Sequence, residues 1–198
     1  MTIASLLQSN GYQTAMVGKW HLGFDENGYE NPLPGGPVDR GFDSFFGIRA
    51  STDIPPYFYL RDDRAVAPPS ASIEANKSDG WSPIQGAFWR AGGIAPDLKL
   101  KDVLPRFTDE AITVIEDHAE TKNKKPLMLY LAYPAPHTPW LPSNKFRGSS
   151  KAGMYGDFLV MVDAMIGRVL EALDKAGMND DTLLFFTSDN GPVWYDTD

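Results

Sequence analysis

The chain of 198 residues contains no cysteine. That absence excludes disulfides, cysteine-ligated zinc, iron–sulfur clusters and a cysteine nucleophile within these residues. Basic side chains are in the minority, with 18 Lys and Arg against 26 Asp and Glu and a formal net charge of −8. A broad nucleic-acid interface needs a basic face and is therefore not expected. No run approaches the ~20 apolar residues of a membrane-spanning helix.

Aromatic residues, proline and glycine are plentiful. The 11 Phe, 8 Tyr and 5 Trp provide large side chains for a core, which argues against disorder. The 16 Pro and 18 Gly indicate long, shaped loops. A chain of this length corresponds to one domain or one large piece of a domain. We expect a single partial domain over residues 1–198, with an irregular excursion at about 23–105 that shapes a pocket.

Hydrophobic patterning predicts alternating helices and strands. Helices are expected at 2–9, where Thr2 is a candidate N-cap, from Thr108 onward, and over about 158–173. Strands are expected where β-branched or apolar runs are bounded by turn residues: 12–17, 44–48, 57–60, 127–132 and 182–187. The runs 127–132 and 182–187 are unbroken, as in strands covered on both faces. This alternation predicts an α/β fold with a largely parallel sheet flanked by helices.

Three polar clusters follow predicted strands at their carboxyl ends. They are Lys19 with His21, then His137, then Asp189 with Asn190. In open α/β sheets this edge is where ligands bind, so the clusters predict one shared site.

Each cluster also has a plain structural interpretation. Gly18-Lys19 lacks the spacing of a phosphate-binding P-loop, but Lys19 and His21 can clamp an oxyanion or belong to a solvated loop. His137 lies between prolines, as a catalytic imidazole or a turn histidine. Asp189 and Asn190 are oxygen ligands suited to Ca²⁺ or Mg²⁺, or a turn. His118 lies within a predicted helix and is expected to be structural.

Taken together, these segments resemble the type I sulfatases of the alkaline-phosphatase-like superfamily. The resemblance rests on the ordered set of residues 18–23 (GKWHLG), 40–47 (RGFDSFFG), 134–139 (PAPHTP), 155–173 and 187–191 (TSDNG). It covers essentially the whole chain. It implies an alkaline-phosphatase-like fold and hydrolysis of sulfate esters, on a sulfated carbohydrate or an aryl sulfate.

The resemblance also implies roles for individual residues. Lys19 would bind a sulfate oxygen, His21 would support a formylglycine nucleophile, and His137 would contact sulfate and protonate the leaving oxygen. Asp189 and Asn190 would be ligands of a divalent cation, usually Ca²⁺.

A further polar contact to sulfate is expected from the segment that follows residues 40–47. Ser51 and Asp53 are the nearest candidates, although a capping or turn pair explains them equally well.

The chain departs from the sulfatase pattern in one important respect. Formylglycine is made from a C/S-x-P-S/A-R motif, and no segment here fits that motif. That motif and an early Asp pair would precede residues 2–9, and a later Lys would follow residue 198. We therefore expect an incomplete domain, an internal portion of a sulfatase. Residues 1–7 show no signal peptide, and the resemblance implies a periplasmic or secreted full-length protein.

Two alternatives remain open. A phosphatase or phosphodiesterase of the same superfamily would use two zinc ions with several His ligands, but this chain has three His in total. A non-catalytic binding protein with the sulfatase fold is the other alternative. Tryptophans in the predicted loops can line a sugar subsite or pack internally: Trp20, Trp81, Trp89 and Trp140.

The missing nucleophile motif predicts that the purified 198-residue polypeptide hydrolyses sulfate esters slowly or not at all. The measurement is release of 4-nitrophenol from 4-nitrophenyl sulfate, with and without added Ca²⁺. Sustained turnover by the 198-residue chain would show that another nucleophile operates.

Overall fold

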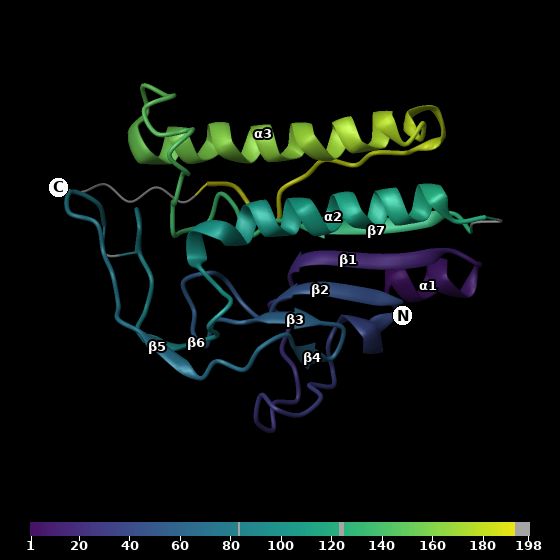
Figure 1. The fold of residues 1–198 in the computed structure, drawn as a ribbon, viewed down its shortest axis with the longest axis horizontal. Helices are drawn as coiled ribbons and strands as arrows, with labels where there is room; N and C mark the ends of the chain where they lie inside the picture. The colour runs from purple at the N-terminus through teal and green to yellow at the C-terminus, as the bar shows by residue number, and fades with distance from the viewer. Residues whose placement is uncertain (83, 123–124, 193–198) are drawn as a thin grey trace.

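A five-stranded sheet organises the chain in a computed structural model that describes residues 1–82, 84–122 and 125–192 (Figure 1). β1 runs parallel to both of its neighbours, β2 and β7. Beyond β2, the short β3 and β4 are antiparallel. The strand order is β4 (Arg64–Ala65), β3 (Tyr59–Arg61), β2 (Ser44–Ile48), β1 (Gln13–Lys19) and β7 (Leu127–Ala132). The expected α/β fold with a mostly parallel sheet is confirmed.

Three α-helices accompany the sheet. α1 (Ile3–Ser9) packs against β1, whereas α2 (Val103–Glu120) packs over β1, β2 and β7, and α3 (Gly153–Lys175) lies alongside α2 (Figure 1). The 3₁₀ helices are η1 (Pro37–Arg40), η2 (Leu100–Asp102) and η3 (Asn179–Asp181). None of the helices within the described residues has the length and apolar character needed to cross a bilayer.

The predicted first helix is confirmed together with its cap. The Ser5 backbone N–H donates to the Thr2 hydroxyl oxygen at 3.0 Å, and the Thr2 N–H donates to the Ser5 hydroxyl oxygen at 2.9 Å. This reciprocal capping box satisfies two backbone donors that a free helix end would leave unpaired.

The helix predicted to begin at Thr108 begins earlier, at Val103. Thr108 is fully buried, and its hydroxyl donates to the Leu104 carbonyl at 3.0 Å, so it is not a cap. Pro105 is compatible with a first helical turn, where its missing N–H would be unpaired anyway. Burial of Val103 and Phe107 in the main core favours this earlier start.

The excursion at 23–105 contains structure of its own. Besides β2 to β4 it holds a small antiparallel sheet of β5 (Ala71–Ile73) and β6 (Gly92–Ile94). Its apolar side chains, including Leu33, Phe58 and Leu98, enter the main core. The excursion is therefore packed onto the sheet and forms one body with it.

The strand predicted at 182–187 is not formed. These residues make no ladder within the described chain, and Leu183, Leu184, Phe185 and Phe186 are 58–82% exposed. Among the described strands β7 pairs on one side only, with β1. Tyr130 of β7 is accordingly half exposed, contrary to the expectation that this strand is covered on both faces. Strand formation needs a partner, which local sequence does not provide.

Gly18 does not end β1, as its sequence context suggested, but lies within it. It pairs with Gly47 on β2 and with Ala132 on β7, so three backbones meet at small residues. A Cβ added to Gly18 would lie 2.0 Å from the Ala132 carbonyl oxygen, and one on Gly47 would lie 1.9 Å from the Gly18 oxygen. The φ of Gly18 is +127°, which further favours glycine.

We expect Gly18→Ala to lower the free energy of unfolding by about 3 kcal/mol or more, because it combines a backbone clash with a strained φ. Urea denaturation followed by circular dichroism measures the loss. Gly11→Ala is the matched control, since Gly11 has φ +86° but nothing within 4 Å of an added Cβ. That variant should lose only about 1 kcal/mol. Equal losses in the two variants would show that the close approach costs nothing.

Candidate functional site

Three loops meet at the carboxyl edge of the parallel strands. The chain leaves β1 at Lys19, and the ladder with β2 continues past it. The N–H of Trp20 donates to the Ile48 carbonyl at 3.1 Å, and that of His21 to the Arg49 carbonyl at 3.0 Å. Because β7 is parallel to β1, the loop that carries His137 leaves the sheet at the same edge.

His21 occupies a strained and electropositive position. Its φ of 59° lies in the left-handed region, which non-glycine residues rarely adopt. Burial lowers the pKa of His21 below its ordinary value of 6.5, and the nearby charges of Lys19, His137 and Arg49 lower it further, whereas Asp53 opposes them. The same five side chains are thus close enough to interact electrostatically.

Asp53 and His137 link the loop after β2 to the loop after β7. The Asp53 Oδ1 lies 3.8 Å from the His137 Nδ1. The Thr52 hydroxyl donates to the Thr138 carbonyl at 3.3 Å, which ties the two loops together. The Asp53 carboxylate is buried, whereas the His137 ring is half exposed. The ring is therefore accessible to a ligand while its neighbour is not.

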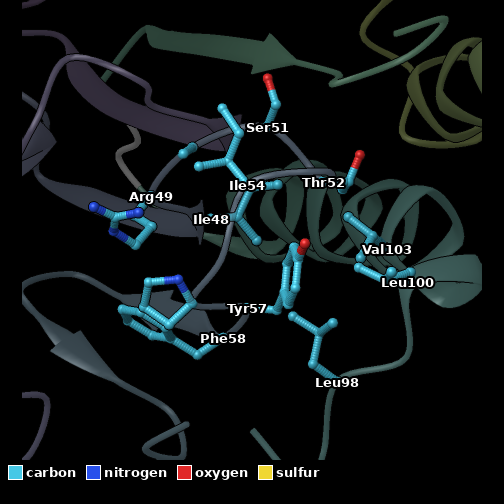
Figure 2. Close-up of a pocket in the computed structure, with 12 residues that line it drawn as sticks. Ile48, Arg49, Ser51, Thr52, Ile54, Tyr57, Phe58, Leu98, Leu100 and Val103 are labelled. Atoms are coloured by element: carbon cyan, nitrogen blue, oxygen red, sulfur yellow. The ribbon is translucent and has the colours of Figure 1, made fainter. Parts of the chain in front are cut away.

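Ser51 is buried at 3% exposure, and its hydroxyl has no hydrogen-bond partner among the described residues. Figure 2 shows the Ser51 and Thr52 hydroxyls pointing away from an apolar pocket of about 230 Å³, toward which Ile48, Leu98 and Val103 lie. A second pocket of about 290 Å³ includes Thr52 and His137 in its lining. Ser51 and Thr52 thus contribute to the lining of the pocket while their hydroxyls point away from its apolar side chains.

Asp189 and Asn190 are not part of this cluster as the structure describes it. Both are exposed, in a segment without helix or strand, and the Asn190 side chain donates to the Gly191 carbonyl. No group of three His, Asp or Glu side chains within the described ranges is arranged to hold a metal ion. The expected cation ligands therefore lack companions among the described residues.

The remaining candidates have structural surroundings. His118 is buried, with Nδ1 3.4 Å from the Gln13 side-chain oxygen, as expected for a structural histidine. Trp140 is buried and packs edge-on against Trp81 with ring centroids 5.0 Å apart. The indole N–H groups of Trp20 and Trp89 donate to the backbone carbonyls of Gly23 and Glu74. Packing and loop closure account for all four tryptophans.

Sequence reasoning missed two arginines near the site. Arg49 follows β2 and pairs with Glu26 at 2.6 Å. Arg90, 37 residues beyond Asp53 in the chain, donates from Nη1 to the Asp53 Oδ2. Neither residue belongs to a recognisable motif, and only the folded excursion brings Arg90 to the loop after β2. No sequence signal was available for this pair.

The mostly parallel sheet defines an α/β protein, with Lys19, His21 and His137 gathered at the carboxyl edge of its strands. Comparison with known proteins is more specific. The Sulfatase family model matches residues 1–197, so the chain belongs to the sulfatase family.

Individual relatives match nearly the whole chain. An N-acetylgalactosamine-6-O-sulfatase of Bacteroides thetaiotaomicron is 32% identical, over 98% of this chain and 43% of the relative. Human arylsulfatase A is 31% identical, over 97% of this chain and 36% of its own length. A solved structure whose title concerns the metabolism of multiple glycosaminoglycans by B. thetaiotaomicron is 30% identical to this chain, with a TM-score of 0.80. The match covers 98% of this chain and 46% of that one. The chain thus spans less than half of these relatives.

The lowered pKa of His21 predicts a pH-dependent stability. Because the unfolded state takes up the proton first as the pH falls below 6.5, the contribution of His21 to stability is present above that pH and is lost as the pH falls through the folded pKa. We expect His21→Gln to reduce the loss of stability between pH 7 and pH 5. Urea denaturation of both proteins at pH 8, where the imidazole is neutral in both states, provides the baseline. An unchanged pH dependence in the variant would contradict this assignment.

Proposed function

We propose that this chain supplies the sulfate-binding and proton-donating side of a sulfatase active site, for a sulfated carbohydrate or an aryl sulfate. The observation that carries the proposal is the convergence of Lys19, His21, Ser51 and His137 at the carboxyl edge of β1, β2 and β7. Three of these can be cationic, and the fourth offers an unpartnered hydroxyl. An anionic, tetrahedral ester group suits this combination.

Each side chain has a distinct role in the proposed reaction. The Lys19 ammonium neutralises charge on a sulfate oxygen. His137, in its charged form, donates a proton to the ester oxygen as its bond to sulfur breaks, so the alcohol leaves neutral. His21, whose pKa is lowered by burial and then by the charges of Lys19 and His137, offers a directional hydrogen bond beside the sulfate.

Ser51 is also proposed to contact the substrate, through its hydroxyl. A buried hydroxyl with no partner incurs a desolvation cost that a bound sulfate oxygen would remove. Asp53, the other residue of this loop expected to contact sulfate, is an anion. Close contact between its carboxylate and a sulfate is electrostatically unfavourable, and its role is considered in the next subsection.

Two chemical groups of the sulfatase active site, formylglycine and the divalent cation, are given no step in this chain. In sulfatases formylglycine supplies the nucleophile and a divalent cation, usually Ca²⁺, stabilises negative charge. The sequence contains no C/S-x-P-S/A-R segment. Asp189 and Asn190 provide at most three side-chain oxygens, two from the carboxylate and one from the amide, whereas Ca²⁺ takes six to eight ligands. The residues present do not fit a calcium site by themselves, and we propose that Asp189 and Asn190 act as ligands only where further carboxylates join them.

The substrate class rests on relatives that cover the whole chain. Their names include an N-acetylgalactosamine-6-O-sulfatase and arylsulfatase A. A sulfated sugar is therefore the first substrate to consider, with an aryl sulfate as the chromogenic substitute. A periplasmic or secreted location accords with such a substrate and forms part of the proposal.

Titration with inorganic sulfate tests the anion site without requiring turnover. We expect sulfate to shift the amide NMR signals of Lys19, His21 and Ser51 in the 198-residue chain. Lys19→Met should weaken binding about five-fold, because loss of one charge near 4 Å costs about 1 kcal/mol in water.

The matched control is Lys151→Met, which removes an exposed lysine just before α3. It should bind sulfate like the unmodified chain. Equal weakening by both substitutions would indicate a general charge effect and contradict a site at Lys19. Tighter binding of phosphate than of sulfate would favour the phosphatase alternative instead.

A further inference from the structure

Asp53 is a buried carboxylate located between two side chains that can carry positive charge. The residue is 5% exposed. Its Oδ2 accepts a hydrogen bond from the Nη1 of Arg90, and its Oδ1 faces the Nδ1 of His137 at 3.8 Å. Within the described chain this Oδ1 has no hydrogen-bond partner. A buried carboxylate oxygen is costly to leave unpaired, so the position calls for a donor.

The contacts of His137, the nearest titratable neighbour of that oxygen, show which ring nitrogen carries a proton. Its Nδ1 lies 2.9 Å from the Thr138 carbonyl oxygen. A carbonyl only accepts hydrogen bonds, so the contact requires a proton on Nδ1. That proton is directed to the Thr138 oxygen, and the Asp53 Oδ1, at 3.8 Å, lies outside hydrogen-bond distance and faces the ring as a nearby negative charge. The Nε2 atom is then the ring nitrogen left for a ligand.

Arg90 holds the other end of the carboxylate. Its backbone N–H and its Nη1 both donate to the Asp53 carbonyl oxygen, at 3.3 and 3.2 Å, and its own carbonyl accepts from the Tyr57 hydroxyl at 2.7 Å. Its guanidinium lies over the Phe88 ring, 5.1 Å from the centroid. These contacts restrain Arg90 from several directions beside the Asp53 carboxylate.

Direct contact between Asp53 and sulfate fits this arrangement poorly. Two unit anions 4 Å apart repel by about 1 kcal/mol in water and by several times more where water is partly excluded. The Asp53 side chain is 7% exposed, whereas that of His137 is 49% exposed. The carboxylate is thus shielded from solvent while the ring is accessible, so Asp53 can act on a ligand through the ring.

We propose that Asp53, anchored by Arg90, is a positioning residue for His137: it holds the imidazole proton on Nδ1 and stabilises the charged ring, so that Nε2 faces the ligand as a proton donor. This inference deepens the proposed function and rests on it for the reaction that the proton serves. The link from Arg90 through Asp53 to His137 joins the excursion to the loop after β7.

Charged and titratable groups surround this link from several elements. They are Lys19 and His21 at the end of β1, Arg49 after β2, Tyr57 before β3, and Lys101 of η2, which shares a pocket lining with His137. Burial raises the pKa of Tyr57 to about 12, so its hydroxyl stays neutral. The other groups are cationic or can become so. The anions beside these groups are Asp53 and Glu26, and Glu26 is paired with Arg49.

Histidine-ring NMR of the 198-residue chain tests the proposal, because the three histidines give few signals to assign. In the unmodified chain we expect nitrogen shifts that place the proton of neutral His137 on Nδ1. In Asp53→Asn we expect the His137 ring to bind its second proton about five-fold more weakly, the equivalent of about 1 kcal/mol for one charge near 4 Å in water. The pKa of His21 should fall further in the same variant, since Asp53 raises it.

Asp63→Asn is the matched control, because it removes the same charge from a half-exposed side chain in the β3–β4 turn. It should leave the His137 ring unchanged. A proton on Nε2 of neutral His137 in the unmodified chain would overturn the proposal without any variant being needed. The proposal would also be overturned if a folded Asp53→Asn protein showed less than a two-fold change in the affinity of the His137 ring for its second proton. The histidine-ring measurement involves no sulfate and no turnover. The positioning role of Asp53 can therefore fail while sulfate binding is confirmed, and sulfate binding can fail while the positioning role is confirmed.

Discussion

The close approach of three parallel backbones at Gly18 is the constraint on which the site depends. β2 and β7 can both lie against β1 there because Gly47 and Ala132 are also small. That register fixes where each strand ends, and so where the loops that follow begin. Lys19 and His21 then emerge beside the loop that carries Asp53, and the loop of His137 closes from the other side. The chemistry of the site follows from strand register.

Positive charge is concentrated locally in a protein that is acidic overall. The chain has a formal charge of −8, yet Lys19, His21, Arg49 and His137 gather at one edge of the sheet. Burial lowers the pKa of His21, and repulsion from Lys19, His137 and Arg49 lowers it further. Asp53 offsets part of that repulsion from a buried position, where it does not compete with a ligand. Overall charge therefore governs solubility, while the arrangement of a few side chains governs binding.

Sequence patterns predicted the elements whose stability is local or whose partners lie within the chain. The boundaries of α1 followed from the Thr2 cap, and β2 matched the predicted residues 44–48. Local patterns failed where the outcome depends on a distant contact. Thr108 has the residue type of a cap, but α2 begins earlier, at Val103, because burial of Val103 in the core favours helix there. Residues 182–187 have the composition of a strand but no neighbour to pair with in the described chain.

The site shows the same division. Strand ends and polar residues predicted the meeting of Lys19, His21 and His137, because the carboxyl ends of parallel strands lie at one edge. The pairing of Arg90 with Asp53 was not predictable, since the two residues lie 37 positions apart and only the folded excursion brings them together. Asp189 and Asn190 were expected at the same edge and do not reach it in this structure. Prediction was thus reliable for what the sheet carries directly and poor for what long loops bring in.

The small-residue contact at Gly18 also has an evolutionary consequence. The sheet cannot accept even one additional methyl group at that level, whereas the surrounding loops carry exposed and half-exposed side chains that tolerate exchange. Selection can therefore alter the loops, and with them the substrate, while the strands that position the loops stay the same. Relatives named for N-acetylgalactosamine-6-sulfate and for aryl sulfates match this chain about equally well, at 31–32% identity. A sheet of fixed register with variable loops is well suited to such divergence.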